Sequence, residues 1–483
     1  MPELKKYKMF INGEWVDSEG KKTFETLNPE NNKPWAVVPE ASAKDVDKAV
    51  KSAQKAFEGE WSKILPRERA KYLRAIGSKL RENAELLGKV ETVDTGKLYR
   101  ETYKQAHYIA EYYDYYAGLA DKVEGTVLPI DKPNIQAITT RIPIGVIAAI
   151  VPWNSQMFLT ATKLAPALAM GNTVVIKASE LAPATMFEFA KLVEETGIPK
   201  GVVNVITGFG EPCGKALTSH NLVEKIAFTG GPETARHIIR NSAENLSQVS
   251  LELGGKSPCI VDKTAPIRIT SKRIVWGKFL NCGQTCIAPD YLLVHEKIKD
   301  QLTQELIFQI EKAFGKNQQD SPDYGRIAHQ NHFNKLKASL ANQNIIYGGN
   351  TDEKDFFFGP TLVDNPTLDS ELMKEEIFGP ILPIISYSNE EMIHKLLENR
   401  ERPLAFYVFS KRKKFIDKLF KRYSFGGGVA NDSIIQFAND NLPFGGVGHS
   451  GMGAYHGKYS FKNFSHEKPV IKRSFLFENI TLS

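Results

Sequence analysis

The sequence predicts an α/β fold, because short apolar strands alternate with amphipathic helices through the middle of the chain. Residues 174–176, 202–206 and 226–228 are apolar runs of strand length. Helical patterns follow at 183–195, where a proline stands in the first turn, and at 232–241. This alternation is typical of a parallel sheet covered by helices on both faces, the usual location of a nucleotide pocket.

Two different patterns precede this region. Residues 7–40 combine short alternating segments with turn pairs such as Asn12-Gly13, which predicts β-hairpins. After Ser42, apolar residues recur at helical spacing, and helices are expected to continue to about residue 120.

A second α/β region is expected from residue 252 onward. Its strands are predicted at 259–261, 292–294, 382–385 and 405–409, and its helices at about 297–313 and 390–399. A cleft between the two regions is the natural place for chemistry.

Composition and charge exclude several classes of protein. The chain of 483 residues is 42% hydrophobic and 24% charged, which is typical of a globular protein. Its net charge is +6, but its basic residues are scattered among 56 acidic ones, so nucleic-acid binding is not expected. The one dense basic run, 411–414, is interpreted as the exposed part of a short helix.

No membrane segment or disulfide framework is expected. The longest apolar run, 142–153, is far shorter than the roughly 20 residues that cross a bilayer, and we interpret it as a buried strand. The first residues lack an apolar leader. Four cysteines without a Cys-x-x-Cys pair favour a reducing compartment, so a cytoplasmic protein is predicted.

Cys286 is the candidate nucleophile. A buried structural role is the commoner explanation for a cysteine. Here the thiol follows the Gly283-Gln284 turn, whose backbone N–H groups could lower its pKa and stabilise an oxyanion. Cys282 lies four residues earlier, but a single Cys-x-x-x-Cys spacing is weak support for zinc, and no metal is predicted.

Two further residues could complete such a site, and each has an ordinary alternative. Glu252 lies between Leu251 and Leu253, where loss of water would make its carboxylate a better general base. It could equally be a strand residue paired with a lysine. The Asn154 amide could donate to an oxyanion or merely cap a helix.

Glycine-rich turns are present, but they do not fit the known phosphate-binding fingerprints. The segments 208–214 and 230–232 each follow a strand and open a helix. The segment 255–257 imitates the end of a phosphate loop, but Ser250 stands where that loop needs glycine.

Seven short motifs occur in a fixed order along nearly the whole chain. They are Pro152-Trp153-Asn154, Lys177-Ala178-Ser179-Glu180, Phe228-Thr229-Gly230, Glu252-Leu253-Gly254-Gly255-Lys256, Gly283-Gln284-Thr285-Cys286, Glu375-Glu376-Ile377-Phe378-Gly379-Pro380 and Pro443-Phe444-Gly445-Gly446. In this combination and order, the chain resembles the aldehyde dehydrogenase superfamily.

The resemblance implies a division of the chain into three parts. A Rossmann-like NAD-binding domain would comprise residues 1–122 and 144–253, and a second α/β catalytic domain residues 254–447. Residues 123–143 and 464–483 would form a small β oligomerisation arm. A homodimer or homotetramer is therefore expected.

The resemblance also implies a reaction, the NAD(P)-dependent, non-acylating oxidation of an aldehyde to a carboxylate. Cys286 would attack the aldehyde to form a thiohemiacetal, whose oxyanion is held by the Asn154 amide and the Cys286 N–H. After hydride transfer, Glu252 would activate the water that hydrolyses the thioester.

Cofactor-binding positions carry over from the matched motifs. They are Trp153, Lys177, Glu180, Gly210, Gly230, Gly231, Leu253, Glu376 and Phe378. A carboxylate such as Glu180 near the ribose 2′-hydroxyl accepts a hydrogen bond from NAD and repels the 2′-phosphate of NADP. NAD is therefore the expected cofactor, with NADP possible.

Substrate-pocket positions are expected at Phe158, Thr162, Thr285, Ile287 and Phe444. Many relatives place an aromatic residue where this chain has Thr162, so a wider aldehyde entrance is expected. The turn after Phe228-Thr229-Gly230 also departs from the family, since Gly231 and Ala235 replace the usual serine and glycine. Its pyrophosphate contacts are expected to differ.

The two halves resemble different classes of the superfamily. Residues up to about 260 are similar to the tetrameric class 1 and 2 enzymes, and those from 261 onward to class 3. The hypothesis is a mosaic with a junction near 257–265. Two alternative hypotheses stay open. One is a catalytically weak homologue or chimera with a structural or binding role. The other is a CoA-acylating semialdehyde dehydrogenase.

Overall fold

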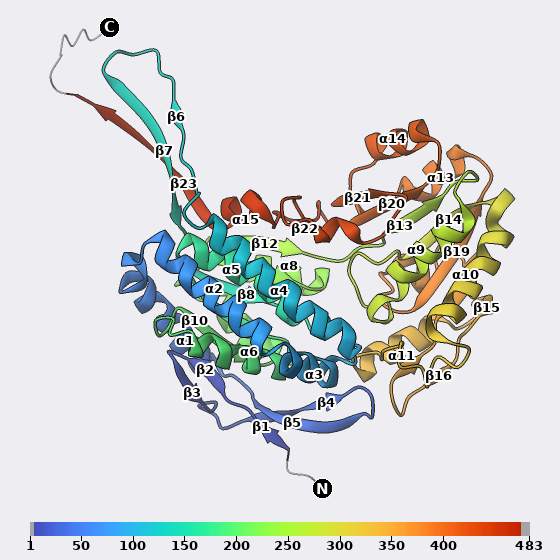
Figure 1. Ribbon diagram of the computed structural model, residues 1–483, viewed down its shortest axis with the longest axis horizontal. Helices are drawn as coiled ribbons and strands as arrows, with labels where there is room; N and C mark the ends of the chain where they lie inside the picture. Colours follow the sequence, from blue (N-terminus) through green and yellow to red (C-terminus); the bar gives the residue numbers. More distant parts are fainter. Residues whose placement is uncertain (1–3, 475–483) are drawn as a thin grey trace.

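The computed structural model describes residues 4–474 and has two α/β units with a projecting arm (Figure 1). The first unit, drawn in blue and green, lies beside the second, drawn mainly in yellow and orange. Both units contain an open sheet with helices packed against it. The predicted α/β fold is thus confirmed.

The first sheet has eight strands in the described part of the chain, in the order β22-β12-β11-β8-β9-β10-β2-β3. Their bounds are β2 (Met9–Ile11), β3 (Glu14–Val16), β8 (Val146–Ile150), β9 (Thr173–Ala178), β10 (Val203–Thr207), β11 (Val223–Thr229), β12 (Gln248–Glu252) and β22 (Gly451–Met452). The five central strands are parallel, whereas β2, β3 and β22 join antiparallel at the edges.

Helices cover both faces of this sheet and form two separate cores. The helices are α1 (Ala43–Glu58), α2 (Pro66–Glu82), α3 (Ala84–Thr95), α4 (Tyr99–Leu119), α5 (Gln156–Met170), α6 (Ala184–Glu195), α7 (Lys215–Thr218) and α8 (Pro232–Ser242). Alternate residues of β9 point to opposite faces, so Val174 packs in the core with α2 to α6 and Val175 in the core with α1, α7 and α8.

The second sheet has the order β15-β18-β19-β14-β13-β20-β21, with only β15 antiparallel to its neighbour. Its strands are β13 (Pro258–Val261), β14 (Tyr291–His295), β15 (Ile345–Tyr347), β18 (Thr361–Asp364), β19 (Ile381–Tyr387), β20 (Ala405–Phe409) and β21 (Gly427–Ala430). Its helices are α9 (Ile267–Phe279), α10 (Lys299–Phe314), α11 (Gln330–Ser339), α12 (Glu371–Lys374), α13 (Glu390–Leu397) and α14 (Lys413–Arg422).

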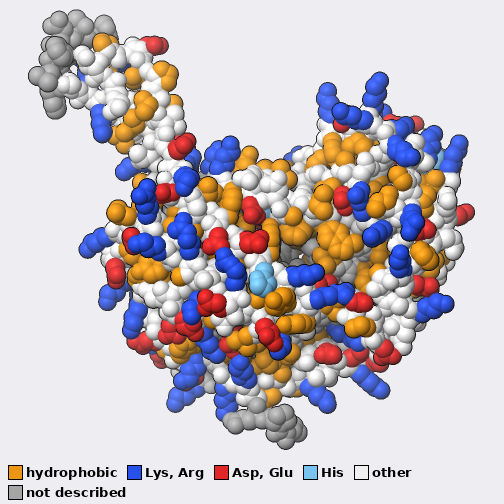
Figure 2. Space-filling model, in the orientation of Figure 1, with side chains coloured by type: hydrophobic (Ala, Val, Ile, Leu, Met, Phe, Trp, Pro, Cys, Tyr) orange, Lys and Arg blue, Asp and Glu red, His pale blue; other side chains and the backbone are white. Residues whose placement is uncertain are grey.

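The arm is a three-stranded sheet of β6 (Val127–Leu128), β7 (Ile135–Pro143) and β23 (Ser465–Arg473). β7 and β23 pair antiparallel over their full length, so the arm joins two segments far apart in sequence. Hydrophobic side chains are visible on its surface (Figure 2). Of the predicted arm segment 464–483, residues 475–483 lie outside the described residues, as do residues 1–3 of the predicted NAD-binding domain.

Smaller elements complete the fold. They are β1 (Lys5–Lys6), β4 (Thr23–Asn28) and β5 (Lys33–Pro39) in one sheet, β16 (Thr351–Asp352) and β17 (Phe357–Phe358) in another, and α15 (Gly457–Asn463) before the arm. The hairpin region predicted at 7–40 thus divides into β2–β3, which extends the first sheet, and β4–β5, which does not.

The apolar run 142–153 begins at the end of β7 and contains the wholly buried strand β8. None of the helices between residues 4 and 474 is long and apolar enough to span a lipid bilayer. The basic run 411–414 leads into the exposed first turn of α14, as expected.

The buried side chain of Asn172 ties the first sheet to the base of the arm. Its Oδ1 accepts hydrogen bonds from the backbone N–H groups of Ile144 (2.8 Å) and Gly145 (3.1 Å). Its Nδ2 donates to the carbonyl oxygens of Ala167 (3.1 Å) and Phe464 (2.9 Å). One side chain therefore joins the β7–β8 link, α5 and the start of β23.

We expect Asn172→Ala to destabilise the folded protein strongly. Two buried N–H groups would lose their acceptor, and an unpaired buried polar group costs about 1–3 kcal/mol, so the loss should be roughly 2–4 kcal/mol. Urea unfolding followed by circular dichroism measures it, with the exposed Asn317→Ala as the matched control. Equal midpoints for the two variants would contradict this role.

Candidate active site

The three predicted catalytic residues meet where the two units face each other. Glu252 is the last residue of β12, and Asn154 lies in the loop between β8 and α5. Cys286 lies between the short 3-10 helix Leu280–Gly283 and β14. Glu252 and Asn154 lie at the carboxyl ends of parallel strands, the edge at which α/β sheets bind ligands, and Cys286 precedes β14 of the second unit.

The loop that carries Cys286 has an unusual backbone. Asn281, Cys282 and Gly283 have positive φ angles of 50°, 52° and 75° in succession. A Cβ on Gly283 would overlap the carbonyl oxygen of Gly379, so only glycine fits there. Non-glycine residues in this region of φ are costly and persist only where surrounding contacts hold them.

Gln284 supplies those contacts. Its Nε2 donates to the carbonyl oxygens of Asn281 and Arg326, both at 3.0 Å. Its Oε1 accepts from the N–H of Ala328 at 3.0 Å. The fully buried glutamine therefore fixes the loop two residues before Cys286.

The Cys286 side chain is partly exposed, and its pKa is raised well above the ordinary value. Burial is the main cause, followed by the negative charges of Glu376 and Glu252. The backbone N–H groups of Cys286 and Ile287 do hydrogen-bond the sulfur and oppose the shift, as the turn suggested. The expected lowering of the pKa is nevertheless wrong, because desolvation and two carboxylates outweigh two N–H dipoles.

Glu252 is buried and paired. Its Oε2 accepts hydrogen bonds from Thr229 Oγ1 at 2.8 Å and from Lys163 Nζ at 3.2 Å. Lys163 Nζ also donates to Thr229 Oγ1 at 2.7 Å and lies 4.8 Å from the centre of the Tyr455 ring. The prediction that Glu252 pairs with a lysine is therefore correct. The residue also lies at the carboxyl end of β12, beside Cys286.

Lys163 is a functional candidate that the sequence reasoning missed. It is fully buried on α5, and burial lowers the pKa of its ammonium group against the opposing effects of Glu252 and Cys286. A single charged residue in an otherwise uncharged helix was the available signal, because a buried charge needs a partner.

The Asn154 amide points at the nucleophile loop. Its Nδ2 donates to the carbonyl oxygen of Gln284 at 3.0 Å, and its own carbonyl oxygen accepts from Asn281 Nδ2 at 3.3 Å. The helix-cap alternative is wrong, since the residue that caps α5 is Ser155, whose side chain makes no capping bond. The second Nδ2 hydrogen is available to a ligand.

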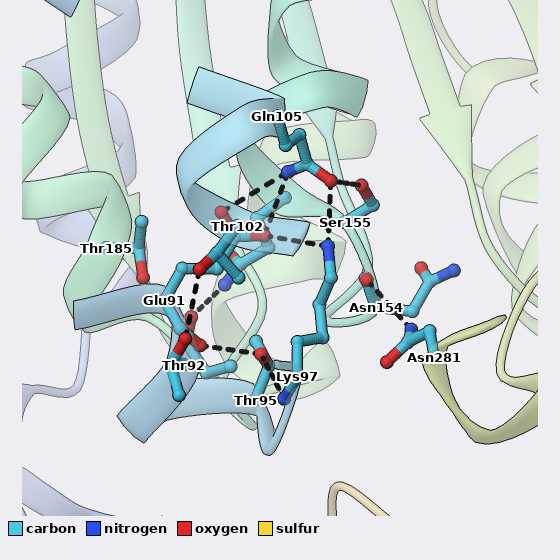
Figure 3. A network of polar contacts seen from close by, with 12 residues as sticks. Glu91, Thr92, Thr95, Lys97, Thr102, Gln105, Asn154, Ser155, Thr185 and Asn281 are labelled. Carbon is cyan, nitrogen blue, oxygen red and sulfur yellow. Dashed lines mark hydrogen bonds and ion pairs between the residues drawn. The ribbon is translucent and has the colours of Figure 1, made fainter. Parts of the chain in front are cut away.

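A buried polar network supports the Asn154 loop from behind (Figure 3). Ser155 Oγ donates to Gln105 Oε1 at 3.0 Å. Lys97 Nζ donates to the same oxygen at 2.7 Å, and Gln105 Nε2 donates to Glu91 Oε1 at 3.0 Å. Because Lys97 also pairs with Glu91, every charge in the network has a partner.

Aromatic side chains gather beside the site. The rings of Trp153 and Phe378 meet edge to face with centroids 5.6 Å apart. His329 and His332, which the sequence reasoning missed, pack on Trp153 at 5.3 and 6.2 Å. Burial lowers the pKa of both histidines to about 4, so both are neutral near pH 7.

Glu376 is held against the end of β12. A Cβ on Gly254 would overlap its carboxylate, and the Gly255 N–H hydrogen-bonds it. Burial, with the nearby charge of Asp290, raises the pKa of Glu376 to about 8. Leu253 is buried, and its N–H donates to the carbonyl oxygen of Ser450 at 3.0 Å.

The remaining predicted cofactor positions lie along the same edge of the first sheet. Lys177, in β9, pairs with Glu180 at 3.2 Å. A Cβ on Gly210 or Gly231 would meet open space, whereas one on Gly230 would overlap the Phe228 ring. Two glycines thus leave the backbone open to a ligand where β10 and β11 end, which suits a dinucleotide phosphate.

The predicted substrate positions are only partly accessible. Phe158, Thr285 and Phe444 are partly exposed, while Ile287 and Thr162 are buried. The Thr162 hydroxyl donates to the carbonyl oxygen of Leu159 at 2.9 Å, within its own helix. Thr162 therefore does not present a polar group to the entrance, because its hydrogen bond is satisfied by α5.

Cys282 has a structural environment. It is buried, and its thiol contacts the Tyr324 hydroxyl. Over residues 4–474, no group of three or more His, Cys, Asp or Glu side chains is arranged to hold a metal ion.

Comparisons with known proteins place nearly the whole chain in one family. The model described as "Aldehyde dehydrogenase family" matches residues 15–470. A (Z)-2-((N-methylformamido)methylene)-5-hydroxybutyrolactone dehydrogenase of Acinetobacter baylyi is 40% identical over 97% of both chains. The aldehyde dehydrogenase family 3 member A2 of Rattus norvegicus is 40% identical over 70% of this chain and 69% of its own. An aldehyde dehydrogenase of Bacillus cereus, solved with NAD+, has a TM-score of 0.92 at 33% identity, with 97% of each chain covered.

We expect Glu376→Gln to make Cys286 more reactive, but only at alkaline pH. Above pH 8 the ionised Glu376 opposes formation of the thiolate, whereas the glutamine does not. Alkylation of Cys286 by iodoacetamide, followed by peptide mass spectrometry, should be roughly three- to tenfold faster, since one pKa unit corresponds to about tenfold in thiolate. The two proteins should react alike below pH 7. A plateau in the parent rate near pH 8 would contradict the raised pKa of Cys286.

Proposed function

Because the chain belongs to the aldehyde dehydrogenase family and is an NAD(P)-dependent enzyme, we propose that it oxidises an aldehyde through a Cys286 thioester that water hydrolyses. The observation that carries this mechanism is the hydrogen bond between Asn154 Nδ2 and the carbonyl oxygen of Gln284. It brings an amide donor from the first unit to the nucleophile loop of the second.

The first step requires proton removal from Cys286. Its pKa is raised, so the thiol is neutral near pH 7 and a base must take the proton as sulfur bonds to the aldehyde carbon. The Glu252 carboxylate, close enough to act on the Cys286 pKa, is that base. The carbonyl oxygen becomes an oxyanion, which accepts from the second Asn154 Nδ2 hydrogen and from the Cys286 N–H.

A dinucleotide bound at the carboxyl edge of the first sheet would supply the hydride acceptor, and Cys286 would hold the oxidised acyl group as a thioester. Glu252 first passes the Cys286 proton to solvent and then takes a proton from the water that attacks the thioester carbonyl. The carbon–sulfur bond breaks, the acid leaves, and the proton held by Glu252 returns to the Cys286 sulfur. Thr229 and Lys163 hold the Glu252 carboxylate during both proton transfers.

The dinucleotide would lie along the carboxyl edge of the first sheet. Glu376 would bind the nicotinamide ribose, beside Trp153 and Phe378, and Leu253 would contact the nicotinamide. Gly210, Gly230 and Gly231 would admit the pyrophosphate. The open space above Gly210 and Gly231 supports this fit.

Cofactor preference depends on Lys177 and Glu180, which would bind the adenosine ribose. Their 3.2 Å ion pair holds the Glu180 carboxylate at the end of β9. A carboxylate there accepts a ribose hydroxyl and repels a 2′-phosphate, so NAD is the preferred cofactor and NADP the poorer one.

We also propose that the arm contacts a second copy in a homodimer or homotetramer. Val127 is 71% exposed and Ile471 66% exposed, which is unusual for apolar strand residues unless another surface covers them. Light scattering distinguishes the monomer from both assemblies.

A cytoplasmic location is consistent with four free cysteines.

The class difference between the two halves remains a proposal, with the junction at 257–265. The rat family 3 relative matches about 70% of the chain, whereas the Acinetobacter relative matches 97%. Separate superposition of residues 4–256 and 266–474 on class 1/2 and class 3 structures tests it. If both halves fit the same class best, there is no mosaic.

The central test is NADH formation with a panel of aliphatic and aromatic aldehydes. Cys286→Ala should be inactive, because it lacks the nucleophile, while the buried Cys259→Ala should retain activity as the matched control. Glu252→Gln should form little NADH even in the first turnover near pH 7, because the same carboxylate is proposed to take the proton of Cys286 and that of the attacking water. Acceleration by CoA would favour an acylating enzyme. If the folded parent protein binds NAD but forms no NADH with any of these aldehydes, a catalytically weak homologue is favoured.

We expect Glu180→Gln to shift cofactor preference towards NADP. Removal of one carboxylate that faces the 2′-phosphate is worth on the order of 1–2 kcal/mol at a partly exposed site, or roughly tenfold in the ratio of kcat/KM values. Initial rates with NAD and NADP measure the ratio. Glu195→Gln, at the end of α6, is the control and should leave the ratio as in the parent.

A further inference from the structure

A pocket of about 460 Å³ opens beyond the carboxyl ends of the neighbouring parallel strands β13 and β20. The chain leaves β13 through α9 towards β14 on one side, and it leaves β20 through α14 towards β21 on the other. Such a divergence is the point at which open α/β sheets usually bind a ligand. Cys286 precedes the amino end of β14, so the pocket and the candidate active site lie at opposite ends of the second sheet.

Two helices begin at this pocket, and neither beginning is capped by a side chain. Pro266, the residue before α9, and Lys413, the first residue of α14, both line the pocket. The first N–H groups of each helix have no acceptor within their own helix, and the helix dipole adds positive potential there. The backbone on both sides of the pocket therefore favours an anion.

The charged side chains that line the pocket are all basic, namely Arg273, Lys411 and Lys413. Lys411 and Lys413 belong to the dense basic run 411–414 and are exposed, and Figure 2 shows Lys and Arg side chains projecting over α14. Neither lysine forms an ion pair within residues 4–474. Two cations are thus available to a ligand.

The carboxylates nearest to the pocket already have counter-ions. Asp262, buried at the end of β13, pairs with Arg412 at 2.7 Å. Glu390 pairs with Lys418 at 2.8 Å and lies 3.6 Å from Arg412. Their negative charges are therefore balanced by residues other than Lys411 and Lys413, so the field in the pocket stays positive.

A buried hydroxyl gives independent support for a ligand. Thr270 of α9 lines the pocket and is only 1% exposed. Its hydroxyl forms no hydrogen bond within the described residues 4–474, although buried polar groups are nearly always paired. The Asn431 side chain, at the end of β21, also keeps its Nδ2 free, because only its Oδ1 is used, by the N–H of Ser410. The pocket therefore presents hydrogen-bond donors that lack acceptors.

We propose that this pocket is a phosphate-binding site, which takes inorganic phosphate or the phosphate group of a small phosphomonoester. Lys411 and Lys413 supply the charge, while Thr270 and the first N–H groups of α9 and α14 donate hydrogen bonds to the phosphate oxygens. Ile269, which is 41% exposed, adds an apolar wall for the rest of an organic ligand. The site goes beyond the proposed function and does not depend on it.

The test is isothermal titration calorimetry of the whole protein with inorganic phosphate and, separately, with glycerol 3-phosphate, at constant ionic strength set by chloride. Thr270→Val keeps the shape and removes the hydroxyl, and it should weaken binding about tenfold. Thr173→Val is the matched control, because Thr173 is a buried threonine of the first unit whose hydroxyl also has no partner.

A surface variant tests the charge without touching the core. Lys413→Gln should weaken binding roughly fivefold, and more at low salt than at high salt. Lys421→Gln, exposed at the other end of α14, is its control and should bind as the parent does. The titrations are repeated with saturating NAD, so that phosphate bound in the dinucleotide site is displaced and only the proposed site is measured.

Tighter binding of glycerol 3-phosphate than of inorganic phosphate would identify an organic phosphate as the ligand, and equal affinities would identify phosphate itself. The proposal is overturned if the parent shows no saturable binding of either probe, or if NAD abolishes the binding. It is also overturned if Thr270→Val and Lys413→Gln both bind with the affinity of the parent.

Discussion

The geometry of the candidate active site depends on two hydrogen bonds between the loop after β8 and the loop after α9. They join Asn154 Nδ2 to the Gln284 carbonyl oxygen and Asn281 Nδ2 to the Asn154 carbonyl oxygen. The proposed nucleophile, Cys286, belongs to one unit and the proposed oxyanion donor, Asn154, to the other, so the proposed mechanism depends on how the units meet. Both loops are braced, one by the buried Glu91–Lys97–Gln105 network and the other by Gln284. Positioning at this level is worth orders of magnitude in rate.

The charges around the site are arranged in two different ways. Glu252 is paired with Lys163 and Thr229, so its negative charge is balanced inside the protein. Lys163 is close enough to interact with Cys286, but burial and two carboxylates still raise the pKa of Cys286. Burial and the charge of Asp290 raise the pKa of Glu376. A protonated thiol next to a balanced carboxylate suits a mechanism in which the nucleophile is activated only as the substrate arrives.

Several side-chain contacts join the part of the chain before residue 257 to the part after residue 265. Ser250 Oγ and the Tyr455 hydroxyl are 2.7 Å apart, and the Tyr455 ring covers Lys163. Tyr108 of the first unit hydrogen-bonds Asp440 of the later segment. These pairs are buried or half-buried and satisfied, as expected for surfaces that have adapted to each other. The two parts of the chain therefore fit each other at the candidate site.

The sequence by itself determined those features that depend on neighbours along the chain. Strand length and helical spacing located β9 to β11 and α8, and the ordered motifs located Cys286, Glu252 and Asn154. It also offered a lysine partner as one role for Glu252, without showing which lysine. Only the tertiary structure identified Lys163, because that partner is 89 residues away and buried on another element. It likewise decided that the Cys286 pKa is raised, that Thr162 bonds within its own helix, and that Asp440 lies beside Tyr108, 332 residues distant. Periodicity and turn chemistry are local, whereas desolvation and electrostatic pairing depend on which surfaces the fold brings together.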